Sequence, residues 1–181
     1  MRRLSREEWI QGAFDALCTG GIDALKVELL AKHLGVTKGS FYHHFQNRRE
    51  LHLGLLEEWE RLGTSAVIDL VESRSDDPVV RLRSLGRAVF APNDQTDEIE
   101  TAIRSWAQHD EAAAAAAARI DARRLVFVSG LLEATGVPKP LAGRRAKLLY
   151  RALIGEFLWR GSGGPTTTRR EIDELVDLLV G

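Results

Sequence analysis

The segment VELLAKHLGVTKGSFYHHF, residues 27–45, contains two short helical patterns separated by a turn. The apolar spacing of the first pattern ends at Gly35, a residue suited to the left-handed position just after a helix. Thr37 can cap the second helix, which places Phe41 and Phe45 four residues apart on one side. Two helices joined by so short a turn lie at roughly 90–120° to each other. The segment therefore predicts a helix-turn-helix.

The second of these helices has a polar side opposite its two phenylalanines. The side chains expected to be exposed there are those of Lys38, Ser40, Tyr42 and His43. Basic and hydroxyl side chains at the start of such a helix suit the major groove of DNA, because they can donate to phosphates and base edges. An ordinary helical hairpin with solvated polar residues explains the spacing equally well.

The next predicted helix begins with two arginines. Asn47 can cap it, which places Arg48 and Arg49 in the first helical turn. The helix dipole disfavours each cation there by about 0.3–1 kcal/mol. A DNA phosphate facing this terminus would offset the penalty, since helix N-termini and arginines both attract anions. Earlier in the chain, either a basic arm or a merely solvated terminus is formed by Arg2, Arg3 and Arg6.

Helical periodicity continues along the chain, without any sustained alternation of the kind that strands show. All five prolines occur at or after Pro78, so the first part of the chain lacks the strongest helix breaker. The alanine run 112–118 leads into apolar residues at helical spacing and is predicted to be helix rather than disordered. The sequence is therefore predicted to be all-α, with helices near 6–19, 27–34, 38–45, 48–71, 79–90, 99–109, 112–134, 141–159 and 171–180.

Composition excludes several classes of protein. The net charge of -1 and the hydrophobic fraction of 44% are typical of a globular chain. No apolar run approaches the ~18 residues needed to span a bilayer, and the N-terminus lacks the apolar run of a signal peptide. We therefore expect a cytoplasmic protein with no membrane partner. The single cysteine, Cys18, makes neither an intrachain disulfide nor a cysteine-based zinc site.

The sequence predicts no metal, cofactor or catalytic site. No two histidines lie three or four residues apart on one helix, and His43 and His44 point about 100° apart. Phosphate-binding loops, nucleophile elbows and cysteine–histidine pairs are absent, and the glycine-rich segment 161–164 precedes Pro165 rather than a helix. Binding is therefore favoured over catalysis.

Several short motifs lie between about Trp9 and Leu51, namely Leu30-Ala31, Gly35-Val36, Lys38-Gly39 and Tyr42-His43-His44-Phe45. Together they resemble the TetR family of bacterial transcription regulators. The resemblance implies a three-helix helix-turn-helix DNA-binding domain at residues 1–51 and a helical effector-binding and dimerisation domain at 52–181. It implies double-stranded DNA as a partner, bound through Lys26, Thr37, Lys38, Gly39, Ser40, Tyr42, His43 and Arg48.

Two of these positions differ from the family's common residues. Ser or Thr often stands where this chain has Lys26, and there it caps the second helix and contacts a phosphate. Lys26 can keep the phosphate contact but cannot accept the capping hydrogen bond. Arg48 stands where the family commonly has a lysine near the phosphates.

The rest of the chain resembles the family in outline, and the resemblance implies that the last two long helices pair across a homodimer. Both helices are apolar on more than one face, which is too wide for a helix that covers a single core. The alternative is that both are fully buried in a monomer. The predicted interface residues are Leu125, Val128, Leu132, Leu149 and Leu153.

Aromatic residues of the later helices are candidates for an effector pocket, although aromatics at helical spacing are more often plain core. The candidates are Trp59, Phe90, Trp106 and Phe127, with Arg104 or His109 as polar partners. The predicted function is a DNA-binding regulator, a repressor that a small hydrophobic effector releases from a palindromic operator. The alternative is a helical small-molecule-binding or interaction protein without specific operator recognition.

Overall fold

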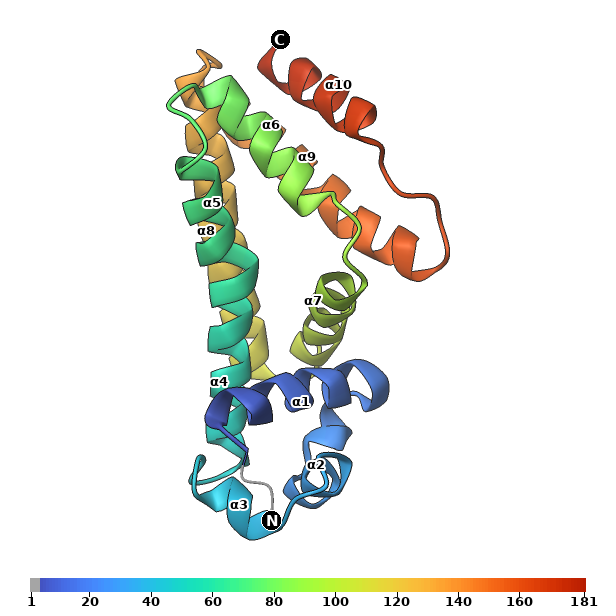
Figure 1. Cartoon of the computed structure of the whole chain (residues 1–181). Helices are drawn as coiled ribbons and strands as arrows, with labels where there is room; N and C mark the ends of the chain where they lie inside the picture. Colours follow the sequence, from blue (N-terminus) through green and yellow to red (C-terminus); the bar gives the residue numbers. More distant parts are fainter. Residues whose placement is uncertain (1–3) are drawn as a thin grey trace. The chain divides into compact units, whose positions relative to one another are not determined.

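The structure is a computed structural model that describes residues 4–181, and every regular element in this range is helical (Figure 1). The all-α prediction is confirmed. The α-helices are α1 (Arg6–Gly20), α2 (Val27–His33), α3 (Lys38–Tyr42), α4 (Arg48–Glu60), α5 (Ala66–Glu72), α6 (Pro78–Val89), α7 (Asp94–Ala107), α8 (Glu111–Ala134), α9 (Lys139–Gly161) and α10 (Arg169–Val180). A 3-10 turn, Ile22–Leu25, precedes α2.

Side-chain caps define where several helices begin. Ser5 and Glu8 form the predicted capping box of α1, in which the Ser5 hydroxyl accepts from the Glu8 N–H at 3.1 Å and the Glu8 carboxylate accepts from the Ser5 N–H at 2.8 Å. Thr168 and Glu171 form a second capping box on α10. Each such cap contributes about 1 kcal/mol, because it satisfies backbone donors that the helix itself cannot pair.

The helix expected over residues 48–71 is not one continuous α-helix. A π-helical turn, Arg61–Ser65, separates α4 from α5. Within this turn the Thr64 side chain is buried, and its hydroxyl accepts a hydrogen bond of 2.8 Å from Arg124 on α8. Arg124 also donates to the hydroxyl of Tyr150 on α9, at 3.3 Å. The interruption therefore coincides with a polar contact to residues much later in the chain.

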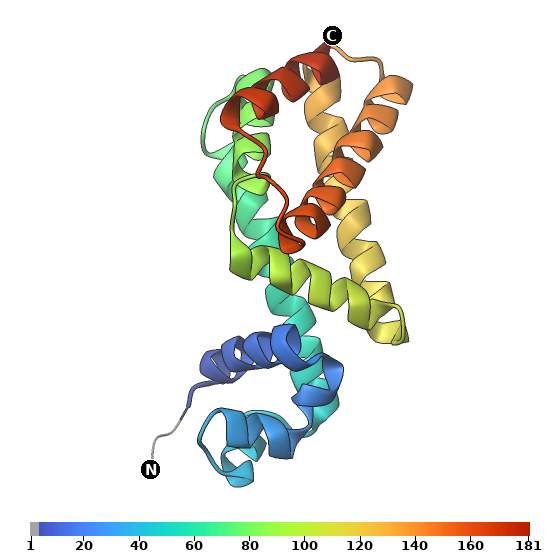
Figure 2. The same cartoon turned by 90° about the vertical axis from the view of Figure 1, so that its right-hand side faces the viewer.

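The chain divides into two compact units. The first comprises residues up to Arg61 together with Glu98–Ala117, and so contains α1 to α4, most of α7 and the beginning of α8. The second comprises Leu62–Asp97 and Ala118–Gly181, with α5, α6, the rest of α8, α9 and α10. Within the second unit, α10 packs alongside α6 in both views (Figures 1 and 2).

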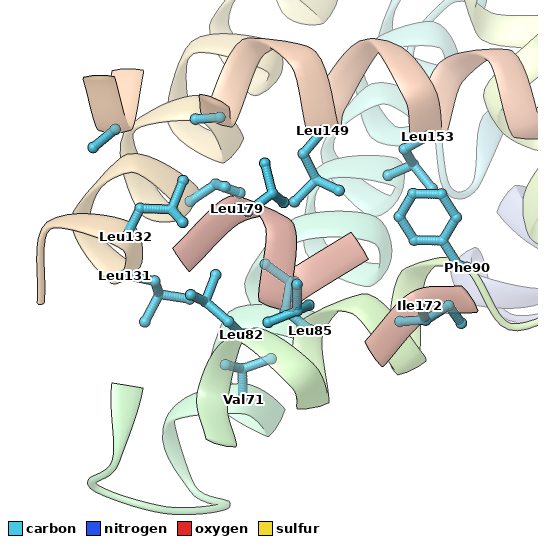
Figure 3. Close-up of a cluster of buried hydrophobic side chains, with 14 of the residues drawn as sticks. Val71, Leu82, Leu85, Phe90, Leu131, Leu132, Leu149, Leu153, Ile172 and Leu179 are labelled. Atoms are coloured by element: carbon cyan, nitrogen blue, oxygen red, sulfur yellow. The ribbon is translucent and has the colours of Figure 1, made fainter. Parts of the chain in front are cut away.

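The second unit has a hydrophobic core made by five helices and the residue that follows α6 (Figure 3). Burying each large apolar side chain contributes about 1.5–3 kcal/mol, so this core supplies much of the stability of the unit. Its labelled members are Val71, Leu82, Leu85, Phe90, Leu131, Leu132, Leu149, Leu153, Ile172 and Leu179.

A buried ion pair fixes the start of α7 to α9 in the second unit. The Arg160 guanidinium donates to both carboxylate oxygens of Asp97, at 2.7 and 2.8 Å, and to the Phe90 carbonyl at 2.8 Å. The two charged side chains are only 7% and 9% exposed. Such a pair must be fully hydrogen-bonded to be tolerated, because both charges have lost their water.

Candidate nucleic-acid interface

The turn between α2 and α3 has the geometry that Gly35 predicts. Gly35 has a φ of 66°, in the left-handed region that favours glycine. Its N–H donates to the Lys32 carbonyl at 3.2 Å, and the Val36 N–H donates to the Ala31 carbonyl at 3.0 Å. These two hydrogen bonds are the Schellman pattern that ends a helix and redirects the chain. The helix-turn-helix is therefore set by local backbone chemistry.

Aromatic packing holds α3 against the rest of the first unit. Phe41 and Phe45 are 0% and 1% exposed, with ring centroids 5.2 Å apart. The Trp9 ring of α1 meets Phe41 edge-on at 5.5 Å. Because these two phenylalanines face inward, the opposite side of the short helix faces solvent.

The residues predicted to contact DNA lie together on α2, α3, the turn between them and the start of α4. Seven of them are exposed and Ser40 is half-buried. Tyr42 is 59% exposed, although a large aromatic side chain in a small domain is usually covered. The exposed residues are Lys26, Thr37, Lys38, Gly39, Tyr42, His43 and Arg48.

Two of these residues stand at helix caps. The Thr37 hydroxyl accepts from the Ser40 N–H at 3.4 Å, as its predicted cap of α3 requires. Lys26 occupies the cap position of α2 without any side-chain capping bond, as its chemistry dictates. Thr37 thus keeps its hydroxyl hydrogen available as a donor while its oxygen holds the helix.

The N-terminus of α4 carries the predicted arginines. Asn47 caps the helix, with its side-chain oxygen accepting from the Glu50 N–H at 3.0 Å. Arg48 and Arg49 follow and are exposed. Arg6 lies in α1 with its guanidinium carbon 5.2 Å from the centre of the Phe45 ring, whereas Arg2 and Arg3 lie outside the described residues.

Carboxylates pair with both lysines of this surface. The Lys26 ammonium lies 2.9 Å from Asp23. The Lys38 ammonium donates to the Glu28 carboxylate at 2.5 Å. These hydrogen bonds lower the pKa of the Asp23 and Glu28 carboxyls, so both are ionised at neutral pH. The sequence gives no direct sign of either pairing, because each depends on how the chain turns before and after α2.

Comparison with known families and structures identifies this surface. Residues 10–55 match the sequence profile of the bacterial regulatory proteins of the tetR family. This segment belongs to the TetR family. The match covers α2, α3 and most of α1, and it ends within α4. Every residue predicted to contact DNA therefore lies inside the TetR segment.

Solved structures share the fold over nearly the whole chain. A transcriptional regulator from Rhodococcus sp. Rha1 superposes with a TM-score of 0.75 at 21% identity, covering 98% of this chain and 95% of the other. A TetR transcription regulator from Haloarcula marismortui gives a TM-score of 0.72 at 16% identity, with 96% and 93% covered. No curated protein matches the sequence. The complete chain thus has the fold of a TetR-type transcription regulator.

The four predicted effector residues fall into two groups. Trp59 and Trp106 are buried in the first unit, where the Arg104 guanidinium lies 6.0 Å from the Trp59 ring and His52 meets Trp106 edge-on at 5.0 Å. Phe90 and Phe127 belong to the second unit, where Phe90 is in the core and Phe127 packs against it. The structure therefore gathers these aromatics pairwise and not at a single site.

The predicted dimer residues mostly face the core of the second TetR-type unit. Val128, Leu132, Leu149 and Leu153 are at most 8% exposed, and Leu125 packs against the same core. Other apolar residues of these helices are exposed: Val126 at 74%, Leu148 at 62%, Leu158 at 59% and Trp159 at 57%. The second apolar face predicted for α8 and α9 therefore consists of these neighbours.

Two further searches bear on the sites that the sequence does not predict. Among residues 4–181 no group of three or more His, Cys, Asp or Glu side chains is placed to hold a metal ion. Over the same residues, no helix combines the length and apolar character that crossing a membrane requires.

Proposed function

We propose that this protein is a homodimeric transcription regulator that binds a palindromic operator. The observation that carries the proposal is the exposed face of α2, α3 and the start of α4, which lies within the TetR segment. This face combines cations for phosphates with hydroxyl, imidazole and phenol groups for base edges, as major-groove recognition requires. Its proposed contacts are Lys26, Thr37, Lys38, Gly39, Ser40, Tyr42, His43 and Arg48.

A second surface supports the homodimer. On α8 the exposed residues Ala118, Ala122 and Val126 recur every four positions and so share one face of the helix. Gly130 continues this spacing, and a Cβ added there would meet nothing within 4 Å. On α9 the exposed apolar residues include Leu148 and Trp159. A monomer rarely leaves such faces in water, and tryptophan is frequent among the residues that dominate binding energy at interfaces.

The palindrome follows from the symmetry of the dimer. Two identical chains related by a two-fold axis present two identical recognition helices, so the preferred DNA site repeats in inverted orientation. The sign of regulation, repression, rests on the family resemblance. A repressor would be released by a ligand that binds the DNA-incompetent arrangement better than the competent one.

A small hydrophobic compound is our proposed effector. The aromatic side chains at Trp59 and Trp106, with the Arg104 guanidinium close by, offer apolar surface beside a charged group in the first unit. Phe90 and Phe127 offer apolar surface in the second. Tryptophan fluorescence and thermal shift would detect a compound that binds near either tryptophan. An effector must also lower operator affinity by the factor by which DNA lowers its own affinity.

Salt-dependent binding to DNA tests the proposed function directly. The purified protein is titrated with a fluorescent duplex of random sequence at several salt concentrations. A DNA-binding protein that neutralises several phosphates shows a linear fall of log K with log salt, with a slope of about -0.9 per phosphate. Capture of genomic fragments at the same salt should then yield an inverted repeat. Absence of salt-dependent binding, or fragments without inverted symmetry, would contradict the proposal.

A further inference from the structure

The lysines and the arginine of the DNA surface differ in their partners. Lys26 and Lys38 are each paired with a carboxylate, and all four side chains are more than half exposed. For Arg48, by contrast, no ion pair is found among residues 4–181. The positive charge that this surface presents to DNA is therefore partly compensated before DNA arrives.

The Glu28–Lys38 pair differs in kind from the Asp23–Lys26 pair. Asp23 and Lys26 are three residues apart and interact locally. Glu28 stands in the first turn of α2, and Lys38 is the first residue of α3, ten positions later. The hydrogen bond thus crosses the turn of the helix-turn-helix and holds the long side chain of the recognition helix against the helix before it.

This arrangement restricts what Lys38 can bind. A lysine ammonium has three donors, of which Glu28 takes one, so two remain for acceptors on DNA. The acceptors of guanine in the major groove are uncharged and can approach beside the carboxylate. A phosphate carries the same sign of charge as Glu28 and competes for the same ammonium, so its approach is disfavoured.

We propose that Glu28 restrains Lys38 from sequence-independent phosphate binding and thereby raises the selectivity of the recognition helix for its operator. The proposal rests on the proposed DNA-binding function and adds a specificity-determining residue to it. An exposed ion pair is weak, so Lys38 can exchange partners when a base edge is offered. The negative charge of Glu28 nevertheless remains beside it and counts against every phosphate.

The test compares wild type with Glu28→Gln, which keeps the size of the side chain and removes its charge. Random-sequence duplex is titrated at several salt concentrations. If Lys38 gains a phosphate, the log-log slope steepens by about 0.9 for each half-site occupied, and affinity at 0.1 M salt rises about eightfold per half-site. Affinity for a captured operator fragment should rise less, so the ratio of operator to random binding falls.

A second background separates release of Lys38 from simple loss of repulsion. In a Lys38→Gln chain, Glu28→Gln should leave the slope unchanged, because no ammonium remains to be released. Glu174→Gln is the matched control, since it removes a carboxylate from an exposed ion pair with Arg170 on α10. It should bind random duplex as wild type does.

The outcomes distinguish this inference from the function on which it rests. Salt-dependent binding by wild type, with Glu28→Gln giving the same slope and affinity, overturns the role of Glu28 and leaves the DNA-binding function standing. An equal gain in both backgrounds also overturns it, because Lys38 would then not be the group restrained. If neither chain binds duplex at any salt concentration, both proposals fail.

Discussion

Arg48 is the residue whose contribution to DNA binding should be simplest to measure. It is exposed at the start of α4, and no carboxylate pairs with it among residues 4–181. Arg48→Ala should weaken binding similarly on every sequence and reduce the salt slope by about 0.9 per half-site, because one phosphate contact is lost. Arg48→Lys should retain the slope, and Arg170→Ala on α10 serves as a control for loss of charge elsewhere. An unchanged slope in Arg48→Ala would remove this residue from the phosphate contacts.

His52, one turn further along α4, should make stability depend on pH. Burial lowers the pKa of this histidine and Arg48 lowers it further, whereas Asp110 opposes the shift. The folded state therefore favours the neutral ring, while an unfolded histidine binds a proton near pH 6.5. The stabilisation is complete above pH 6.5 and is lost as pH falls from there through the lower folded pKa.

His52→Phe tests this dependence, since it preserves an aromatic ring beside Trp106 and removes the titrating group. Urea unfolding at pH 7.5 and pH 5.5 compares the free energies of unfolding. Wild type should lose more stability on acidification than His52→Phe does. Equal losses in the two proteins would show that another group is responsible.

At the scale of the helices, the ion pair between the start of α7 and α9 is the polar contact most sensitive to change. Asp97→Asn leaves the Arg160 charge buried with only Glu156, 3.4 Å away, as a remaining carboxylate. We expect a loss of about 3 kcal/mol in the free energy of unfolding, as for other broken buried pairs. Denaturant unfolding measures it.

The pair between α6 and α10 provides a matched comparison. Arg87 and Asp173 make a bidentate contact of similar geometry, but their side chains are 39% and 31% exposed. Asp173→Asn should cost only about 0–1 kcal/mol, because water replaces the lost interaction. Equal costs at the two sites would contradict the view that burial makes the Asp97 contact important.

Local chemistry explains which elements the sequence could predict. The caps at Ser5, Thr37 and Asn47 depend on residues at most three positions away, and all three occur as expected. The π-helical turn coincides with a contact between Thr64 and Arg124, sixty positions apart, so nothing in its own pattern reveals it. The exposed side of α3 followed from two phenylalanines four residues apart, whereas the pairing of Lys38 with Glu28 required the folded turn between them.

On the scale of the whole molecule, the apolar faces of α8 and α9 illustrate the same limit. The sequence shows that both helices have more apolar surface than one core needs, but not which leucines turn inward. Leu149 and Leu153 join the core, while the adjacent Leu148 is 62% exposed. Neighbours on a helix point about 100° apart, so a shift of one position exchanges core for surface.

The exposed faces therefore determine which substitutions should test the homodimer. Val126→Glu and Leu148→Glu each place a carboxylate on an apolar surface without touching the core, so both should release a folded monomer. Burying an unpaired charge costs several kcal/mol, which is enough to shift a micromolar dimer strongly towards monomer. Sedimentation equilibrium at micromolar concentration measures the mass, and circular dichroism checks that each variant remains helical.

Leu178→Glu is the matched control for this experiment, because Leu178 on α10 is 76% exposed and Val126 is 74% exposed. It should remain dimeric, since it lies on neither α8 nor α9. A monomeric variant should also bind a captured inverted repeat far more weakly than wild type, because each chain then contacts one half-site independently. A wild-type protein that sediments as a monomer, or a Val126→Glu dimer that binds DNA as wild type does, would show that these faces do not form the dimer.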